Sequence, residues 1–192
     1  MLAGKDVALA ATIVRRGGVI AYPTETVYGI GALATDEAAI GRVYAVKKRP
    51  ADQPLSIAVS GFDMLGEVAF IEREGFIKKF LPGPVTVILE KKPVLPDALT
   101  AGSDYVGIRY PDHAMALALI AMTGPIVSTS ANLHGKPDPV AAGEVRVDVD
   151  YVLDGGRCRY AGPSTIVDLR EYRIVRKGAM CEEVERYMRE SK

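Results

Sequence analysis

Short apolar segments alternate with helical segments along the whole chain, and this alternation limits the fold more than any other feature of the sequence. Apolar spacing, Gly and Pro stops and β-branched runs predict the boundaries. Helices are expected at 5–16, 36–47, 63–80 (as one or two helices), 112–122 and 182–190. Strands are expected at 19–22, 55–59, 85–89, 105–110, 126–129, 152–153, 164–169 and 173–176. The pattern predicts an α/β or α+β fold with a mixed sheet, because the strands are too irregularly spaced for simple parallel winding.

Length and charge narrow the classes of function. A chain of 192 residues fits one domain. Lys plus Arg and Asp plus Glu each total 24, so the zero net charge argues against sequence-blind nucleic-acid binding over the whole surface. The longest apolar run, 114–122, is shorter than the roughly 18–20 residues that cross a bilayer. Lys5 and Asp6 precede the first apolar stretch, so the N-terminus lacks the order of charged region, apolar core and cleavage site that a signal peptide has. We therefore expect a cytoplasmic protein with no membrane partner.

Metal sites and covalent catalysis have little support in the sequence. The chain has only two cysteines and two histidines and no CxxC pair, which argues against a zinc site; we expect no direct protein ligand of a metal. The sequence contains no GxxxxGK[ST] or GxGxxG loop and no distinctive Ser-His-Asp or Cys-His spacing. Catalysis by positioning and charge stabilisation is therefore favoured over a covalent mechanism.

The segment YPTETVYGIG, residues 22–31, follows a predicted strand and combines hydroxyls, one carboxylate and two glycines. Loops at strand ends are where α/β proteins keep their ligands, and glycine lets backbone approach a ligand closely. A turn with capping hydroxyls explains the same residues equally well. The residues alone leave both interpretations open.

The segment KKRPADQP, residues 47–54, ends a helix before Pro50, because the residue before a proline avoids the α region. In an extended backbone Lys47 and Arg49 would point to the same side, an arrangement suited to a polyphosphate. Cations that offset the dipole at a helix C-terminus, an effect worth about 0.3–1 kcal/mol, are the commoner explanation of such a pair.

Polar residues also lie at the ends of later strands. Ser128, Ser130 and Asn132 alternate, and such a row needs partners from the backbone or from a ligand such as a nucleotide. Arg109 and Arg176 end predicted strands and need an anion or several acceptors, which a structural salt bridge would also supply. Another group of arginines is expected on solvated surface, with an RNA backbone as the alternative contact: Arg157, Arg159, Arg170 and Arg173.

Taken in order, YPTETVYGIG, KxRP with a following Asp, LPGPVTVIL, GIR, STSAN and STIVD resemble the YrdC-type threonylcarbamoyl-AMP synthases. The resemblance covers about residues 10–180, and the combination of KxR, SxN and PTET is quite specific. It implies the short form of the family, with a single YrdC-like domain over residues 1–192. It also implies a twisted, open mixed sheet with flanking helices and a concave, basic cavity.

The resemblance implies a nucleotidyltransferase that makes L-threonylcarbamoyladenylate and pyrophosphate from L-threonine, bicarbonate or CO2, and ATP, with Mg2+ accompanying the ATP. A partner transferase complex would then move the threonylcarbamoyl group to the adenosine beside the anticodon of tRNA. Direct contact with tRNA is left open. The alternative class is a non-catalytic module that binds double-stranded RNA or tRNA on the same concave face.

The resemblance also assigns roles to individual residues. Lys47 and Arg49 match a pair that holds phosphates and is expected to be catalytic. The positions expected to bind ATP are Lys47, Arg49, Gln53, Tyr105, Ser128, Ser130, Asn132 and Arg176. The positions expected to bind threonine are Thr24, Arg109 and Ser164. Gln53 stands where relatives often carry Asn or Lys, Tyr105 where Thr or Ser is common, and Ala58 where some members have a threonine-contacting His.

Overall fold

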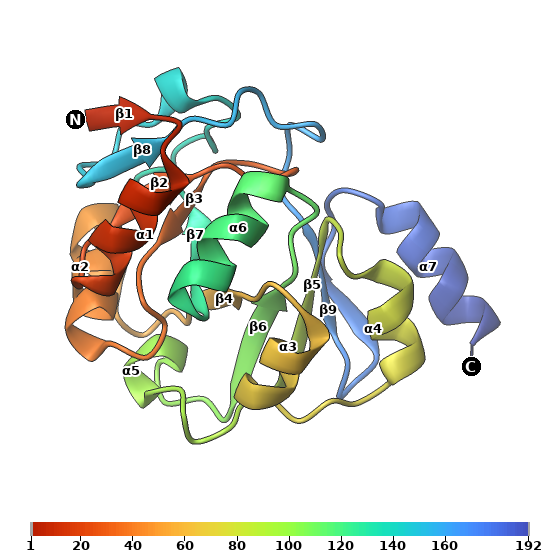
Figure 1. Ribbon diagram of the computed structural model, residues 1–192. Coiled ribbons are helices and arrows are strands. Elements are labelled where there is room, and N and C mark those ends of the chain that lie inside the picture. Colours follow the sequence, from red (N-terminus) through yellow and green to blue (C-terminus); the bar gives the residue numbers. More distant parts are fainter. Residues whose placement is uncertain (1, 192) are drawn as a thin grey trace.

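Ten strands form one mixed sheet in the computed structural model, which describes residues 2–191 (Figure 1). The strands are β1 (Leu2–Gly4), β2 (Ile20–Tyr22), β3 (Gly29–Gly31), β4 (Ser56–Ala58), β5 (Val85–Glu90), β6 (Tyr105–Arg109), β7 (Ile126–Ser130), β8 (Tyr151–Leu153), β9 (Thr165–Asp168) and β10 (Arg173–Arg176). The helices are α1 (Val7–Arg15), α2 (Glu37–Lys47), α3 (Phe62–Val68), α4 (Glu74–Phe80), α5 (Asp97–Thr100), α6 (Ala114–Thr123) and α7 (Cys181–Glu190), with a short 3-10 turn at Ala142–Glu144.

The sheet mixes parallel and antiparallel neighbours, as the irregular spacing of the strands predicts. The order across the sheet is β1-β8-β2-β3-β7-β4-β6-β5-β9-β10. The pairs β1–β8, β8–β2, β4–β6 and β5–β9 are parallel, and the other neighbours are antiparallel. The predicted fold class, a mixed open sheet with flanking helices, is therefore confirmed. The assignment of residues 1–192 to a single domain stays a prediction.

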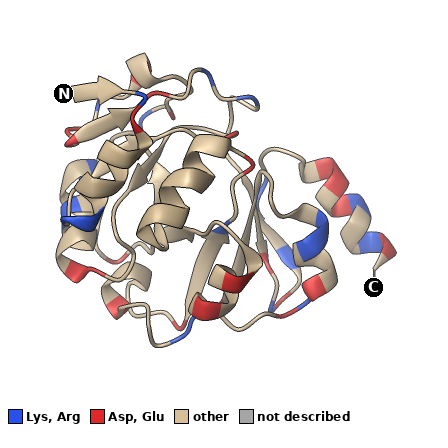
Figure 2. Cartoon of the chain, viewed as in Figure 1, with Lys and Arg blue, Asp and Glu red and all other residues tan. Residues whose placement is uncertain are grey.

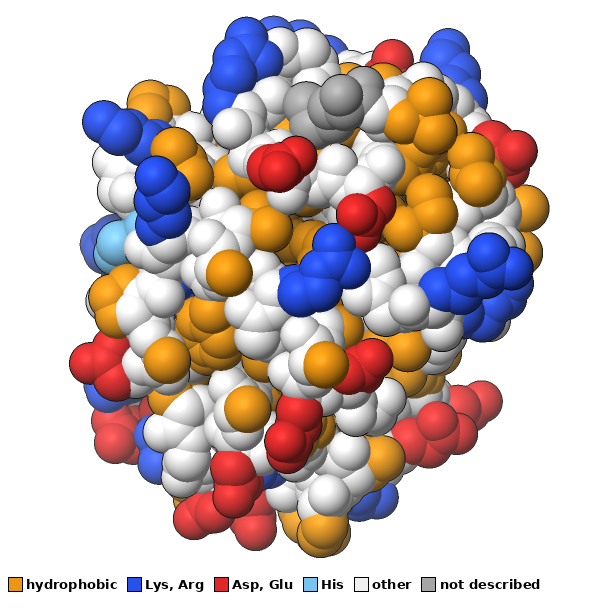
Figure 3. All heavy atoms as spheres, turned by 90° about the vertical axis from the view of Figure 1, so that its left-hand side faces the viewer, with side chains coloured by type: hydrophobic (Ala, Val, Ile, Leu, Met, Phe, Trp, Pro, Cys, Tyr) orange, Lys and Arg blue, Asp and Glu red, His pale blue; other side chains and the backbone are white. Residues whose placement is uncertain are grey.

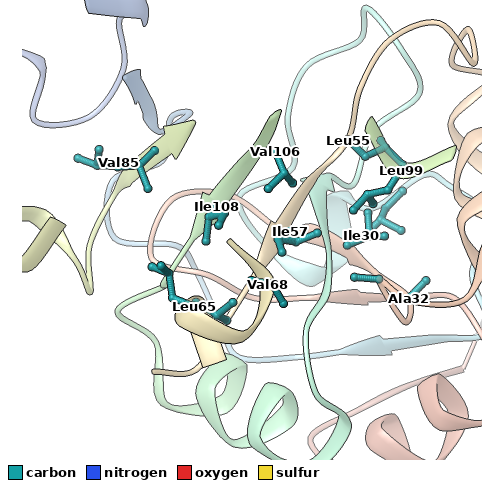
Figure 4. Packing of buried hydrophobic residues seen from close by; sticks show 14 of the residues in the cluster. Ile30, Ala32, Leu55, Ile57, Leu65, Val68, Val85, Leu99, Val106 and Ile108 are labelled. Carbon is teal, nitrogen blue, oxygen red and sulfur yellow. The ribbon is translucent and has the colours of Figure 1, made fainter. Parts of the chain in front are cut away.

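Alternate residues of the central strands have opposite surroundings, because side chains on a strand alternate between the two faces of the sheet. One set is fully buried in the main hydrophobic core: Ile57, Val87, Ile108 and Val127. Figure 4 shows core residues of β4 and β6 packed close to residues of α3 and α5. The residues next to them in the sequence are small or polar: Ser56, Thr86, Gly107 and Ser128. This second set leaves room for a cavity on the sheet.

Helices α1 and α6 pack side by side and form a second apolar cluster with β2 and β8 (Figure 1). Tyr22 of β2 belongs to this cluster, and its ring lies against the glycines of β3. A Cβ atom built on Gly29 or Gly31 would lie 3.1 Å from a ring atom of Tyr22. The glycines of the YPTETVYGIG segment therefore make room for a buried ring.

Two aspartates cap helices where the sequence predicts helix starts. Asp36 caps α2, and its Oδ1 accepts hydrogen bonds from the backbone N–H of Ala38 at 2.9 Å and of Ala39 at 3.1 Å. Asp6 caps α1 in the same way, accepting from the N–H of Leu9 at 2.9 Å. Each cap satisfies N–H groups that have no partner inside the first turn of a helix.

Other local predictions need correction. The prediction that Asp112 caps α6 is wrong: His113 is the N-cap residue and makes no capping bond, while Asp112 pairs with Arg159. The segment expected as a turn after β2 contains a strand, β3, because its backbone pairs with both β2 and β7. β1 and α5, with three and four residues, are too short to give a periodic pattern.

Charged residues of both signs are distributed over the molecule. Figure 2 shows Lys or Arg together with Asp or Glu on α2, α4 and α7. Figure 3, which turns the left side of Figure 1 toward the viewer, shows cations, carboxylates and hydrophobic side chains interspersed on that face. Within residues 2–191, no helix is both long enough and apolar enough to cross a membrane.

Candidate active site

A cavity of about 470 Å³ lies on the sheet, lined by residues of β3–β7, β9 and β10 and of the loops beside them. The small or polar residues of the central strands line it, among them Ser56, Gly107 and Ser128. At Gly107 a side chain would be crowded, because a Cβ there would lie 2.5 Å from the Ser56 hydroxyl oxygen. The alternation along the strands thus creates the hollow, with apolar residues turned to the core and small residues turned to the cavity.

The lining of this cavity contains more cations than carboxylates. Among the described residues it contains four arginines, Arg49, Arg109, Arg170 and Arg176, but one carboxylate, Asp138. Burial lowers the pKa of Arg49 and of Arg176, because desolvation disfavours the charged form. Arginine nevertheless keeps its charge at physiological pH. The cavity therefore suits an anionic ligand, even though the chain has no formal net charge.

Arg109, at the end of β6, forms a buried ion pair with Glu25. Its Nη2 donates to Glu25 Oε1 at 2.5 Å, and the two side chains are 5% and 2% exposed. Its Nη1 donates to the backbone carbonyls of Gly83 and Val85. Arg109 also lines the cavity. The salt bridge that could explain this arginine is thus present, and it fixes a guanidinium group at the cavity wall.

The Thr24 hydroxyl organises the loop between β2 and β3. It donates to the Val27 carbonyl at 2.7 Å and accepts from the N–H of Thr26 at 3.1 Å and of Val27 at 3.2 Å. Thr24 and Thr26 both line the cavity, and their hydroxyl oxygens lie 2.8 Å apart. The Thr24 hydroxyl thus makes the hydrogen bonds of a turn, and the ligand-binding role of this segment stays a prediction.

Ser164 and Arg176 meet at the β9–β10 side of the cavity. Arg176 donates from Nη2 to the Ser164 carbonyl at 2.9 Å and to the Ser164 hydroxyl at 3.1 Å. The Ser164 hydroxyl also lies 2.7 Å from the hydroxyl of Thr86, on β5. These partners of Arg176 are neutral, so the charge of its guanidinium is not neutralised by them.

The backbone from Lys47 to Arg49 is not extended, which corrects the sequence-based expectation. Lys47 is the last residue of α2, and Lys48 follows in the left-handed conformation with φ of 51°. Arg49 lines the cavity and donates only to backbone carbonyls, those of Gln53 and Pro54. The geometry on which a common direction of Lys47 and Arg49 was predicted is therefore absent at these described residues.

The Lys47 ammonium is buried and holds the loop after β7. It donates to the carbonyl and the side-chain oxygen of Asn132, at 3.0 Å and 2.9 Å, and to the carbonyl of Ser130. The Ser130 hydroxyl donates to the same Asn132 side-chain oxygen at 2.7 Å. Desolvation lowers the pKa of Lys47 to about 8, and the nearby charge of Arg49 contributes. Lys47 therefore holds the STSAN segment in place by hydrogen bonds and is not among the residues that line the cavity.

Arg170 is exposed, as the sequence predicts, and it also lies over the ring of Tyr105. The guanidinium carbon of Arg170 lies 3.8 Å from the centre of the Tyr105 ring, and both residues line the cavity. Arg170 pairs with the buried Asp168, with Nη2 at 2.7 Å from Oδ2. Hydrogen bonds from Arg170 lower the pKa of Asp168. The only sequence signal for this arrangement of Tyr105, Asp168 and Arg170 is that Arg170 closely follows the STIVD strand.

Most of the residues predicted for the site come together in this cavity. Its lining contains Thr24, Arg49, Tyr105, Arg109, Ser128, Ser130, Ser164 and Arg176. Lys47, Gln53 and Asn132 are not in the lining, although Lys47 and Asn132 are bonded to Ser130. Ala58 is fully buried in the α1–α6 cluster beside Arg109 of the neighbouring strand. The roles predicted for these residues stay predictions.

Comparison with known proteins places the chain in a family. The family model Sua5_yciO_yrdC, described as "Telomere recombination", matches residues 12–178. The chain belongs to this Sua5–YciO–YrdC family. A threonylcarbamoyl-AMP synthase of Pyrococcus abyssi is 42% identical over 95% of this chain and 57% of the relative. A protein of the same name from Pseudomonas putida is 37% identical over 93% of this chain and the whole of the relative.

Solved structures of family members share the fold. P. abyssi Sua5, in a crystal structure described as complexed with L-threonine, superposes with a TM-score of 0.90 at 39% identity, covering 96% of this chain and 59% of Sua5. The crystal structure of E. coli YciO gives a TM-score of 0.78 at 26% identity over 93% of this chain and 94% of YciO. The chain thus spans less than two thirds of P. abyssi Sua5 and nearly all of YciO.

Proposed function

We propose that this protein is a threonylcarbamoyl-AMP synthase. The observation that carries the proposal is the shared cavity, which gathers Arg49, Arg109 and Arg176 with hydroxyl groups from strands far apart in the sequence. The substrates would be ATP, L-threonine and bicarbonate or CO2, and the products threonylcarbamoyl-AMP and pyrophosphate. The names of the relatives from P. abyssi and P. putida support the same activity.

Threonine would bind at the Arg109 end of the cavity. Threonine is a neutral zwitterion, so it needs directed hydrogen bonds more than an excess of cavity charge. The Arg109 guanidinium is held by Glu25 and two carbonyls, which presents its remaining donors in a fixed direction toward a carboxylate. The hydroxyls of Thr24 and Ser164 line the same cavity and would orient the amine and hydroxyl of the substrate.

The triphosphate of ATP would bind the arginines that lack a carboxylate partner. Arg49 and Arg176 make hydrogen bonds with neutral oxygens of the protein, so their charge is available to phosphate. The threonine amine adds CO2, loses a proton and becomes an N-carboxylate. An oxygen of that carboxylate then attacks the α-phosphorus, and the bond to the β-phosphate oxygen breaks to release pyrophosphate. Arg49 and Arg176 would stabilise the negative charge on the phosphoryl oxygens.

Magnesium is proposed to enter together with ATP. Within the described residues no group of three or more His, Cys, Asp or Glu could hold a metal ion alone. The lining does offer one carboxylate, Asp138, and the Ser130 hydroxyl. This set fits Mg2+, which is commonly held by one or two carboxylates, water and substrate phosphates. The ion would neutralise phosphate charge when bound.

The test is pyrophosphate release from ATP, threonine and bicarbonate. We expect Arg49→Ala to lower the rate about 100- to 1000-fold, the usual loss for one preorganised charged donor, with the fold intact. We expect threonine to be preferred over serine as the substrate by about 1–3 kcal/mol, the difference that one methyl group makes in an apolar pocket. Release that is independent of threonine would contradict the substrate assignment. RNA binding without pyrophosphate formation would support the RNA-binding alternative instead.

The fate of the product is a further part of the proposal. A mixed carbamic–phosphoric anhydride is an activated acyl group, so a second enzyme that transfers it to tRNA would be the partner. We expect such a transferase to transfer the threonylcarbamoyl group to tRNA only when this protein, ATP, threonine and bicarbonate are all present.

A further inference from the structure

The cavity has two ends with different chemistry. Tyr105 and Arg109 begin and end β6, and four residues of a strand span about 13 Å. The Arg109 end carries the ion pair with Glu25 and the hydroxyls of Thr24 and Ser164. The Tyr105 end carries the Tyr105 ring with Ser103 and Arg170 beside it, and the apolar Leu55 and Ile88 also line the cavity. An aromatic and aliphatic lining suits a flat ligand group better than it suits phosphate.

Arg170 lies beside Tyr105 and, like Arg109 but unlike Arg49 and Arg176, it pairs with a buried carboxylate. Asp168 holds its guanidinium by two hydrogen bonds, from Nη2 at 2.7 Å and from Nε at 3.3 Å. The carboxylate is on a side chain that is 2% exposed and accepts further bonds from the N–H of Arg170 and of Glu171. The position and plane of the guanidinium are therefore set by a fixed partner.

The pairing with Asp168 changes what Arg170 can bind. Its charge is balanced by the carboxylate, whereas Arg49 and Arg176 have only neutral partners. Arg170 is for this reason a poor partner for phosphate. One face of its guanidinium covers the Tyr105 ring, but the side chain is 39% exposed and lines the cavity. A ligand in the cavity can therefore reach the exposed part of the Arg170 side chain.

We propose that the base of the nucleotide stacks on the guanidinium of Arg170, so that Tyr105, Arg170 and the purine form three layers. Asp168 is a positioning residue in this arrangement. Nucleobases stack on arginine planes as they do on aromatic rings, and a guanidinium between two π systems is attracted to both. The inference rests on the proposed function, because it requires that ATP occupies this cavity.

The decisive variant is Arg170→Lys, which keeps the charge but removes the plane. Binding of ATP and of inorganic triphosphate, both with Mg2+ and without threonine, is measured by calorimetry. We expect the variant to weaken ATP binding about 5- to 150-fold, the range for loss of one stacked base, and to leave triphosphate binding within about twofold. Arg173→Lys is the matched control, because Arg173 is exposed, pairs with Glu171 and does not line the cavity.

Unchanged ATP affinity in Arg170→Lys would overturn the stacking proposal, and so would an equal loss of ATP and triphosphate affinity. The failure of the proposed function has a different signature. In that case the unmodified protein itself would bind neither ATP nor triphosphate, or would bind both without forming pyrophosphate when threonine and bicarbonate are added.

Asp168→Asn provides a second test with an opposite sign. The amide keeps an acceptor for the N–H groups of the turn but no longer balances the charge of Arg170. We expect triphosphate to bind more tightly and the ratio of ATP affinity to triphosphate affinity to fall. A merely structural role of Asp168 would weaken both ligands together. Tyr105→Ala should lower the same ratio, because it removes the ring that lies against Arg170.

Discussion

At the level of single residues, the buried ion pair of Glu25 and Arg109 bears on stability and also fixes a guanidinium group that lines the cavity. Removing one partner of a buried ion pair leaves an uncompensated charge. We expect Glu25→Ala to lower the free energy of unfolding by about 3–5 kcal/mol, measured by urea denaturation. Glu171→Ala is the control, because its pair with Arg173 is exposed and should contribute less than about 1 kcal/mol. Equal effects of the two substitutions would contradict the importance of burial for the Glu25 pair.

A second prediction for a single residue concerns Lys47 and pH. Burial lowers the pKa of Lys47 in the folded state to about 8, against an ordinary value of 10.5. Between these values the unfolded chain binds more protons than the folded one, so stability should rise with pH there. Below pH 8 the lysine is charged in both states and the cost of its burial is present in full.

The comparison with Lys47→Met isolates this effect. The free energy of unfolding of the unmodified protein relative to the variant should rise from pH 8 to pH 10.5, by at most about 1.4 kcal/mol per pH unit. Urea denaturation at several pH values measures it. A difference that stays constant over this range would mean that Lys47 has an ordinary pKa in the folded protein.

Among the helices and strands, α2 carries Lys47 to the STSAN loop, and its start depends on Asp36. The Asp36 carboxylate satisfies two backbone N–H groups of the first turn. We expect Asp36→Ala to lower the free energy of unfolding by about 1 kcal/mol, while Asp36→Asn, which retains a good capping group, changes it little. Thermal unfolding monitored by circular dichroism checks both. A loss in Asp36→Asn as large as in Asp36→Ala would contradict the capping role.

The helices and strands also show where sequence patterns stop being informative. The central strands were predictable because β-branched runs such as Val85–Glu90 are bounded by Pro and Gly signals. β3 was not, because Gly29–Gly31 has weak strand propensity and is held by pairing with β2 and β7. The cap of α6 was misplaced by one residue, since Asp112 is used by Arg159. Local propensity predicts an element well only where tertiary pairing does not override it.

Across the molecule as a whole, ligand binding and folding are linked. A ligand that binds only the folded state adds about 2.7 kcal/mol of stability at a concentration of 100 times its Kd. For a chain of this length we expect ATP with Mg2+ to raise the melting temperature by about 5–10 °C at that concentration. Arg49→Ala should give a much smaller shift at the same ATP concentration. A shift of equal size in this variant would remove Arg49 from the binding site.

Patterns in the amino-acid sequence are enough to predict the fold class, the family and several of the polar residues that line the cavity. Strand periodicity is a local property, and motifs such as PTET, KxR and GIR are runs of a few consecutive residues that can be recognised in the sequence without knowledge of the fold. This is why the sequence alone singles out Thr24, Arg49 and Arg109, all of which line the cavity.

The partner of each charge, in contrast, depends on the folded arrangement of the whole chain. Glu25 meets Arg109 across 84 positions of sequence, and Lys47 meets Asn132 across 85. Arg170 is exposed, as expected, but its contact with Tyr105 arises because β9 and β6 both lie beside β5 in the sheet. Side-chain pairing depends on strand order and on the backbone direction at single residues such as Lys48, and a local pattern contains neither.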